Sequence, residues 1–247
     1  MHKNKVLLKI FIYCLTIEIG FVIFDLTVNW MRWSDSGAIR RMFNITREDS
    51  LASFFAVFQT IVVAAVCWII LFIIQRIKTK SNYTKAGWLT LAIFFSYMAI
   101  DDGAMLHERI GTVFKHASES ELISYGWQIV IAPLFVVMGC FLFLFLWKHN
   151  PDRRQKLWLC AAIVCLGSAV CIDFIEGMPV GFNWISSFLQ LPVKTVSHFS
   201  KSIEEFLEML GMTFFLILTI QYLIRLTFEV DVTIKNGKVS VRSNIGS

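Results

Sequence analysis

The residues most able to do chemistry in this sequence are acids placed in apolar surroundings. Of its eighteen acidic residues, ten lie within or at the ends of long apolar stretches. An acid at the centre of a bilayer costs roughly 2.5–3.5 kcal/mol, so such side chains face the protein interior or water. Ten are too many to be incidental, and we expect most of them to belong to a functional cluster. They are Glu18, Asp25, Asp101, Asp102, Glu108, Asp173, Glu176, Glu204, Glu205 and Glu208.

Carboxylates contributed by several helices, together with imidazole, suit a divalent metal. Carboxylate oxygens favour Mg, Mn or Ca, and added imidazole shifts the preference towards Fe or Zn. Helix-bundle cores hold carboxylate-bridged metals. Without a metal, closely packed carboxylates repel one another and some take up protons. We therefore expect a divalent metal as cofactor, although the sequence does not distinguish Fe, Zn, Mn and Mg. The predicted ligands are Asp101, Glu108, Asp173, Glu176, Glu205, Glu208, His198 and His107.

Helical spacing decides which ligands can share a face. Asp173 and Glu176 are three residues apart, as are Glu205 and Glu208, so each pair lies on one helical face. His198, seven residues before Glu205, joins the second pair if that helix begins early enough.

The third apolar stretch is less regular. Asp101 and Glu108 are seven residues apart and lie about 20° from one face line, whereas Asp102 lies about 100° away. His107 points to roughly the opposite side. These four residues can be ligands of one site only if the helix distorts, and Gly103 would ease such a distortion.

Other polar residues are candidates for binding a substrate or passing protons. Glu18 and Asp25 lie seven residues apart on one stripe of the first apolar stretch. At the mouth of the site, Arg109 and Lys201 would hold an anionic headgroup or phosphate. The predicted substrate or relay residues are Glu18, Asp25, Asp102, Gln59, Gln128, Arg109 and Lys201.

These groups also have structural interpretations. Ser202 and Glu205 match a capping box, in which Ser202 caps a helix that begins at 203 and Glu205 merely favours the helix dipole. Asp102 can instead pair with Arg109 at the outer surface. The stripe of acids in the first stretch is equally suited to hydrogen bonding between helices.

The composition shows where these residues must be held. The chain has 247 residues, of which 56% are hydrophobic and 17% charged, with a mean hydropathy of +0.64. A soluble domain carries about 25% charged residues, so a cytosolic enzyme, a disordered tail and a nucleic-acid-binding module are excluded. A bilayer-crossing helix needs roughly 20 mostly apolar residues. Six stretches qualify, at about 6–30, 51–75, 86–110, 124–147, 157–180 and 203–225.

The predicted fold is an all-α integral membrane protein. A six-transmembrane-helix bundle takes up residues 1–227, and a tail follows over 228–247. In the tail, apolar residues alternate on both sides of Asn236 and Gly237, which predicts a short β-hairpin. Apolar residues at near-helical spacing before Pro192 predict a short helix in the membrane interface.

Basic residues predict the orientation of the bundle. Fifteen of the 23 Lys and Arg residues fall on the side of both termini, and eight fall on the other side. The positive-inside rule then places both termini in the cytoplasm of a plasma membrane, in bacteria the inner membrane. In this orientation the acids converge on the outer half of the bundle.

Function is inferred from these acids, because the sequence carries no HExxH, GxSxG, P-loop or ExxH pattern. The leading hypothesis is a membrane-embedded metalloenzyme acting on a membrane-resident or outer-face substrate, either a lipid or a small molecule. The alternative is a proton- or cation-coupled transporter that uses the same acids as a relay. A second alternative is a non-catalytic assembly or sensor subunit. The expected partners are the lipid bilayer and the substrate, with no nucleic acid, and the sequence does not indicate an oligomeric state.

Overall fold

The computed structural model describes most of the chain. It covers residues 2–77, 80–106, 109–110, 127–150, 152–178, 181–235 and 238–243, with side chains over the same ranges except 2–4, 127–132 and 229 onwards.

A long helix occupies each of the six apolar stretches, and shorter elements lie between them. Along the chain the elements are α1 (His2–Phe24), the π-helix η1 (Asp25–Trp30), α2 (Gly37–Phe43), α3 (Leu51–Arg76), α4 (Asn82–Ala104), α6 (Trp127–His149), α7 (Arg153–Glu176), α8 (Asn183–Leu189), α9 (Val193–Glu229), β1 (Val230–Lys235) and β2 (Lys238–Ser243).

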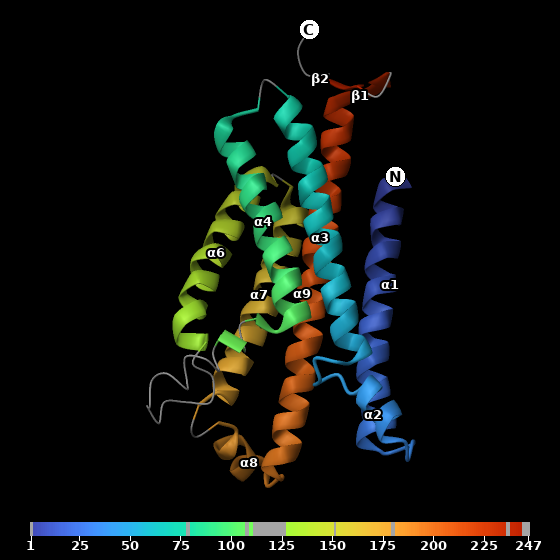
Figure 1. Cartoon of the computed structure of the whole chain (residues 1–247), viewed down its shortest axis with the longest axis vertical. Coiled ribbons are helices and arrows are strands. Elements are labelled where there is room, and N and C mark those ends of the chain that lie inside the picture. Colours follow the sequence, from blue (N-terminus) through green and yellow to red (C-terminus); the bar gives the residue numbers. More distant parts are fainter. Residues whose placement is uncertain are drawn as a thin grey trace.

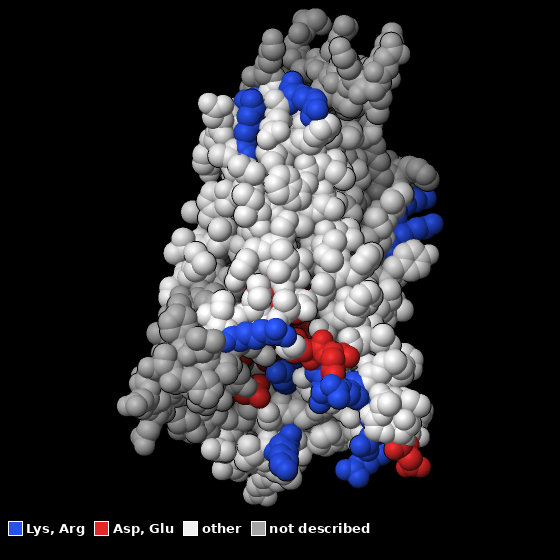
Figure 2. All heavy atoms as spheres, viewed as in Figure 1, with Lys and Arg blue, Asp and Glu red and all other residues white. Residues whose placement is uncertain are grey.

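Within the described ranges, four helices are long and apolar enough to cross a membrane: Lys5–Trp30, Leu51–Arg76, Arg153–Glu176 and Val193–Phe228. The helix Pro133–His149 is apolar but shorter. On the face shown in Figure 2, a broad, almost uncharged band separates charged residues near the two ends. The helical architecture and this band are compatible with a membrane-embedded protein.

The helix α9 organises the bundle. It is 37 residues long and packs against α7, α3 and α1, and α4 in turn packs against α3. The long helices run side by side, with α1 antiparallel to α9 (Figure 1). The short helices α2 and α8 lie at one end, whereas the strand pair and the first turns of α1 lie towards the other. The end of α1 is therefore next to the start of α9.

The sixth long helix begins ten residues earlier than predicted, at Val193. The carbonyl oxygen of Pro192 accepts hydrogen bonds from the backbone N–H groups of Thr195 and Val196, at 2.9 and 3.2 Å, and so opens the helix. The capping-box interpretation of Ser202 is therefore wrong, because Ser202 lies inside the helix and its hydroxyl donates to the carbonyl oxygen of His198 at 2.9 Å. The predicted interfacial helix before Pro192 corresponds to α8.

The tail forms two short strands in the segment where the sequence pattern predicts a hairpin. They pair antiparallel, with Val230 opposite Ser243 and Lys235 opposite Lys238. The strand β1 follows α9 directly, and β2 contacts α3.

A close approach between α4 and α6 gives a stability prediction. A Cβ atom added at Gly87 would lie only 1.9 Å from Cε2 of Phe145. The Phe145 ring is fully buried and packs against Trp88, Tyr83 and His149, so it has no space to move aside. We expect Gly87→Ala to lower the free energy of unfolding by about 1–3 kcal/mol, the usual cost of overpacking. Thermal unfolding in detergent, followed through the reaction of buried thiols with a fluorescent maleimide, measures the change.

Gly139→Ala, on α6, is the matched control because no atom beyond the adjoining backbone of the same helix lies within 4 Å of the added Cβ. It should leave the unfolding temperature unchanged or raise it, since alanine favours a helix over glycine by about 1 kcal/mol. Equal destabilisation by the two substitutions would contradict the close packing of Gly87 on Phe145.

Candidate functional site

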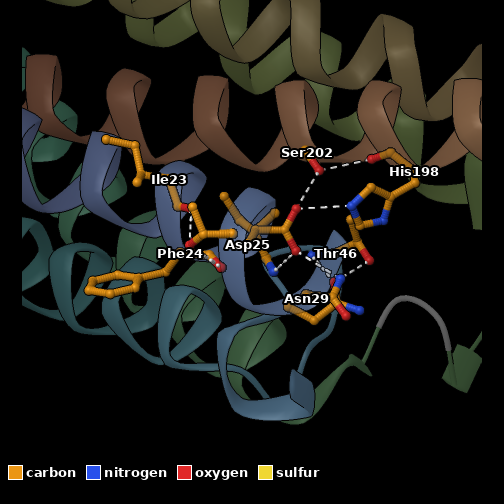
Figure 3. Close-up of polar contacts among 10 residues, drawn as sticks. Ile23, Phe24, Asp25, Asn29, Thr46, His198 and Ser202 are labelled. Atoms are coloured by element: carbon orange, nitrogen blue, oxygen red, sulfur yellow. Dashed lines mark hydrogen bonds and ion pairs between the residues drawn. The ribbon is translucent and has the colours of Figure 1, made fainter. Parts of the chain in front are cut away.

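The candidate site is built around Asp25, where α1 passes into η1. The Asp25 carboxylate is 3% exposed and accepts four hydrogen bonds. Its Oδ2 accepts from His198 Nε2 at 2.9 Å and from Ser202 Oγ at 3.3 Å, and its Oδ1 accepts from Asn29 Nδ2 at 3.1 Å and from the backbone N–H of Ile45 at 3.3 Å (Figure 3). The Ser202 hydroxyl hydrogen is shared with the carbonyl oxygen of His198. The remaining hydrogen bonds to the two carboxylate oxygens favour the ionised form of the group.

The π-helix is the local feature that ends α1 at this site. The backbone N–H of Met31 donates to the carbonyl oxygen of Leu26 at 2.9 Å, five residues earlier. Single π turns inside α-helices are rare and occur frequently at functional sites. Arg32 follows with a left-handed φ of 56°, which turns the chain away towards α2.

His198, on the second turn of α9, is held in a fixed orientation. Its ring stacks on Trp30, with centroids 5.0 Å apart and an interplanar angle of 19°, and its Nε2 faces Asp25. Because a carboxylate only accepts hydrogen bonds, Nε2 carries the hydrogen. In a neutral ring, Nδ1 then carries the lone pair, on the ring edge turned away from Asp25 (Figure 3).

His198 also lines an open cavity of about 410 Å³. Its lining combines two ammonium groups, two hydroxyls and one imidazole, contributed mainly by the first turns of α9. The ammonium groups can donate hydrogen bonds to an anion. The hydroxyl hydrogens of Thr46 and Ser197 are already donated to Asn44 and Glu176. The lining residues are Thr46, Val193, Lys194, Ser197, His198 and Lys201.

The loop between α2 and α3 completes the cavity wall. The side-chain Oδ1 of Asn44 accepts hydrogen bonds from the backbone N–H and the hydroxyl of Thr46, at 3.1 and 2.8 Å. At the end of the loop, hydrogen bonds from Arg47 and Arg41 lower the pKa of Asp49 to about 2. These contacts fix the loop that carries Thr46 and the Ile45 N–H group.

Lys201 is surrounded by carboxylates of α7 and α9, which we call the acidic group. It comprises Asp173, Glu176, Glu204, Glu205 and Glu208. Lys201 interacts electrostatically with Glu205, Glu176 and Glu204, and also with Glu48. Glu204 interacts in addition with Glu208 and Asp173.

Two oxygens of the acidic group have different surroundings. Oε1 of Glu176 accepts a hydrogen bond from Ser197 Oγ at 3.1 Å, which ties the acidic group to the cavity wall. Glu204 is 7% exposed, and its Oε2 is buried with no hydrogen-bond partner among the described residues.

The structure does not gather the predicted metal ligands into one centre within the residues it describes. No three His, Cys, Asp or Glu side chains there are arranged to hold a metal ion. His198 faces Asp25 instead of the acidic group. Asp101 is buried and Asp102 is half-buried on α4, where both act electrostatically on Tyr97.

Some predicted residues lie outside the described ranges. These are His107 and Glu108, together with the side chain of Gln128. The metal centre therefore stays a prediction. Arg109 was expected to hold an anion together with Lys201, and its side chain is exposed. The residue that lines the cavity together with Lys201 is instead a second lysine, Lys194.

Two predicted relay residues, Glu18 and Gln59, form a separate buried cluster with Thr213. The Gln59 Nε2 atom donates to Glu18 Oε1 at 3.0 Å and to Thr213 Oγ1 at 2.7 Å. The Thr213 hydroxyl in turn donates to Glu18 Oε1 at 2.5 Å. We call these three residues the Glu18 cluster.

An apolar layer lies between the Glu18 cluster and Asp25. Ile45 and Met209, with 0% and 1% exposure, form its centre, and Phe21, Val22 and Phe55 pack against them. Glu18 and Asp25, the two acids of the predicted stripe in the first apolar stretch, therefore make two different contacts between helices.

Sequence patterns did not indicate the hydroxyl groups or Lys194. Ser197, Ser202 and Thr213 are common residue types in helices, where their hydroxyls usually bond the carbonyl oxygen one turn earlier. A usable signal was the i, i+4 spacing of His198 and Ser202, which places both on one helical face once α9 is known to begin at Val193.

Comparison with known proteins gives a family and no activity. A family model described as a domain of unknown function (DUF8692) matches residues 10–222, which include α1 from its third turn, the Asp25 site, the acidic group and most of α9. No curated protein and no solved structure matches the chain. Because the match extends over most of the sequence, the chain belongs to the DUF8692 family.

Proposed function

We propose that this protein is a six-span membrane protein that binds an anionic group of a membrane-resident or outer-face substrate in the cavity and exchanges a proton with it through His198. The observation that carries the proposal is the imidazole of His198, fixed by Asp25 at 2.9 Å on the wall of a cavity that also contains Lys194 and Lys201. In this proposal the protein is an enzyme.

The topology in this proposal is six spans with both termini in the cytoplasm. It is supported by the excess of Lys and Arg on the side of the termini. The start of α1 and the strand pair lie towards one end of the bundle, and the α2 and α8 end lies opposite (Figure 1). The cavity, built from the start of α9 and the α2–α3 loop, then opens at the outer face.

The chemistry follows from the tautomer that Asp25 selects. With hydrogen on Nε2, the Nδ1 lone pair takes a proton from a bound substrate or water and later returns it. Positioned acid–base groups of this kind contribute about 10²–10⁴-fold to a reaction rate. The lysine ammonium groups hold the negative charge of the substrate near this nitrogen.

The metalloenzyme form of the hypothesis keeps one supporting observation. The Oε2 of Glu204 is buried beside other carboxylates and has no hydrogen-bond partner among the residues that the structure describes. The transporter alternative needs a continuous polar path. The apolar layer of Ile45 and Met209 separates Glu18 from Asp25 and favours an enzyme site over a relay. The sensor or assembly alternative is tested by deleting residues 228–247.

Chemical modification tests the cavity while the substrate is still unidentified. Diethyl pyrocarbonate reacts with an accessible imidazole lone pair, and mass spectrometry of peptides gives the rate for each histidine. We expect His198 to react, and glycerol 3-phosphate at ten times its dissociation constant to slow the reaction ~tenfold by occupying the cavity. Glycerol, which lacks the phosphate, should leave the rate unchanged.

His149 is an internal control. Its Nδ1 lies 2.8 Å from the carbonyl oxygen of Phe145 and its Nε2 lies 3.3 Å from Thr84 Oγ1, so neither nitrogen is available. It should react slowly and show no response to phosphate. Lys194→Gln should weaken protection of His198. Reaction of His198 at the same rate with and without glycerol 3-phosphate would overturn the anion-binding proposal.

A further inference from the structure

The buried carboxyl group of Glu18 has an uneven hydrogen-bond pattern. Glu18 has 0% exposure and lies where α1, α3 and α9 meet. Its hydrogen bonds from Gln59 Nε2 and Thr213 Oγ1 both reach the same oxygen, Oε1. The other oxygen, Oε2, is buried with no partner among the described residues, and so is the amide oxygen Oε1 of Gln59.

Two buried acceptors without donors are costly. Leaving a buried acceptor unpaired costs more than a hydrogen bond contributes, and the cost rises when the group is charged. An ionised Glu18 would place part of a negative charge on an oxygen that receives no hydrogen bond. A single added proton changes the number of unpaired oxygens, because a protonated carboxyl group can donate one hydrogen bond.

We propose that Glu18 is a protonated carboxylic acid whose Oε2–H group donates to Oε1 of Gln59. The Gln59 amide donates to Glu18 Oε1, and the acid donates back to the amide oxygen, so the two side chains form a closed acid–amide pair. One proton thereby satisfies both orphaned oxygens. The pair, with Thr213, is a buried proton-binding site that holds α1 against α3 and α9, and it is independent of the function proposed for the cavity.

The reverse orientation of the Gln59 amide requires the same proton. Amide nitrogen and oxygen are assigned from the hydrogen-bond network. Exchanging them places Gln59 Oε1 at the position 3.0 Å from Glu18 Oε1 and 2.7 Å from Thr213 Oγ1. Three oxygens would then be in mutual contact, because Thr213 Oγ1 also lies 2.5 Å from Glu18 Oε1. The single hydroxyl hydrogen of Thr213 can occupy only one of these contacts, so a second hydrogen, carried by Glu18, is still needed.

The surroundings keep this proton in place. The thiols of Cys14, on α1, and Cys165, on α7, lie in electrostatic range of Glu18, and a neutral thiol supplies no counter-charge. Towards the cavity, the layer centred on Ile45 and Met209 is apolar. The proton therefore has a structural role, and the Glu18 cluster is distinct from the acid–base pair of Asp25 and His198.

Infrared difference spectroscopy tests the proposal. A protonated carboxylic acid has a C=O stretch above the amide I band that shifts to lower frequency in D₂O. We expect wild-type protein at neutral pH to show such a band and Glu18→Gln to lack it. Asp25→Asn is the control and should leave this band unchanged, because the hydrogen bonds that Asp25 accepts from Asn29 and the Ile45 N–H group favour its ionised form. No band lost in Glu18→Gln would overturn the proposal.

Two further variants test the pairing itself. Gln59→Leu keeps Glu18 and removes the oxygen that accepts its hydrogen, so the band should move to higher frequency, and an unchanged band contradicts the acid–amide pair. Glu18→Gln offers the same donor and acceptor as a protonated acid and should keep the wild-type unfolding temperature, whereas Glu18→Leu should lower it. An equal fall in the unfolding temperature of Glu18→Gln and Glu18→Leu would also contradict the proposal.

Discussion

Asp25→Asn is expected to abolish proton transfer by His198 while the protein remains folded. The amide oxygen of the new side chain can still accept from the Ile45 N–H group and from Asn29, which now reach Asp25 Oδ1. Its amide nitrogen, however, is a donor and faces His198 Nε2, so the ring must move its hydrogen to Nδ1. The lone pair then points at the amide and away from the cavity. We expect any reaction that uses His198 to slow about 10²–10⁴-fold.

Two measurements follow the change of tautomer directly. The ¹⁵N chemical shifts of histidine-labelled protein report which ring nitrogen carries the hydrogen, and reaction of His198 with diethyl pyrocarbonate should fall to background. The unfolding temperature should stay near wild type, because a single hydrogen bond contributes about 1 kcal/mol.

Asp25→Ala is the contrasting variant. It leaves the His198 and Ile45 donors without their acceptor, and each unpaired buried donor costs about 1–3 kcal/mol. It should therefore unfold at a clearly lower temperature than Asp25→Asn. An unchanged His198 tautomer in Asp25→Asn would show that Asp25 does not set the hydrogen position, and the acid–base role of His198 would be lost with it.

The positions of the long helices can be predicted from the sequence, because each one needs about 20 mostly apolar residues in a single continuous stretch. The start of α9 does not follow so simply. Hydropathy falls after Pro192, where Lys194 and His198 give polar turns, yet the helix already begins at Val193. The π turn at Asp25 has no composition signal either, because it accompanies contacts of Asp25 with His198 and the Ile45 N–H group, which are distant in sequence.

The candidate site shows the same limit. Asp25 and His198 both stood out as polar residues in apolar surroundings, but the sequence assigned one to a relay and the other to a metal. Depth along a helix can be estimated from position in the chain, whereas the facing partner depends on helix rotation and on which helices are neighbours. Glu18 and Gln59 were both predicted as substrate or relay residues, whereas their pairing through Thr213 needed the packing of α9 against α1 and α3.

Lys201→Met is expected to be strongly destabilising, because Lys201 is the cation among the carboxylates Glu205, Glu176 and Glu204. Methionine keeps the apolar stem and removes the ammonium group. Removing the cation that acts on these carboxylates resembles the removal of one partner of a buried ion pair, which costs about 3–5 kcal/mol. We expect the lower end of this range since Lys201 is only half-buried. Thermal unfolding of the purified protein measures the loss.

Lys194→Met is the matched control because Lys194 is exposed on the same cavity, where an ion pair is worth about 0–1 kcal/mol. Adding Glu205→Gln to Lys201→Met should restore part of the stability, since it removes one of the carboxylates left without a cation. Coupled neighbours of this kind differ from additivity by about 0.5–3 kcal/mol. An unchanged unfolding temperature in Lys201→Met would show that Lys201 does not balance the acidic group.

The Lys201→Met variant also decides between a metal and an ammonium group as the resident counter-charge. If the acidic group binds a divalent metal, Mn²⁺ or Zn²⁺ at 100 times its dissociation constant should restore about 2.7 kcal/mol. Wild-type protein purified without chelators should then carry near-stoichiometric metal that is lost in Glu208→Gln. If neither metal stabilises the variant and the wild type is metal-free, Lys201 itself is the counter-charge. In that case a phosphate drawn into the cavity competes with Glu176 and Glu205 for the same ammonium group.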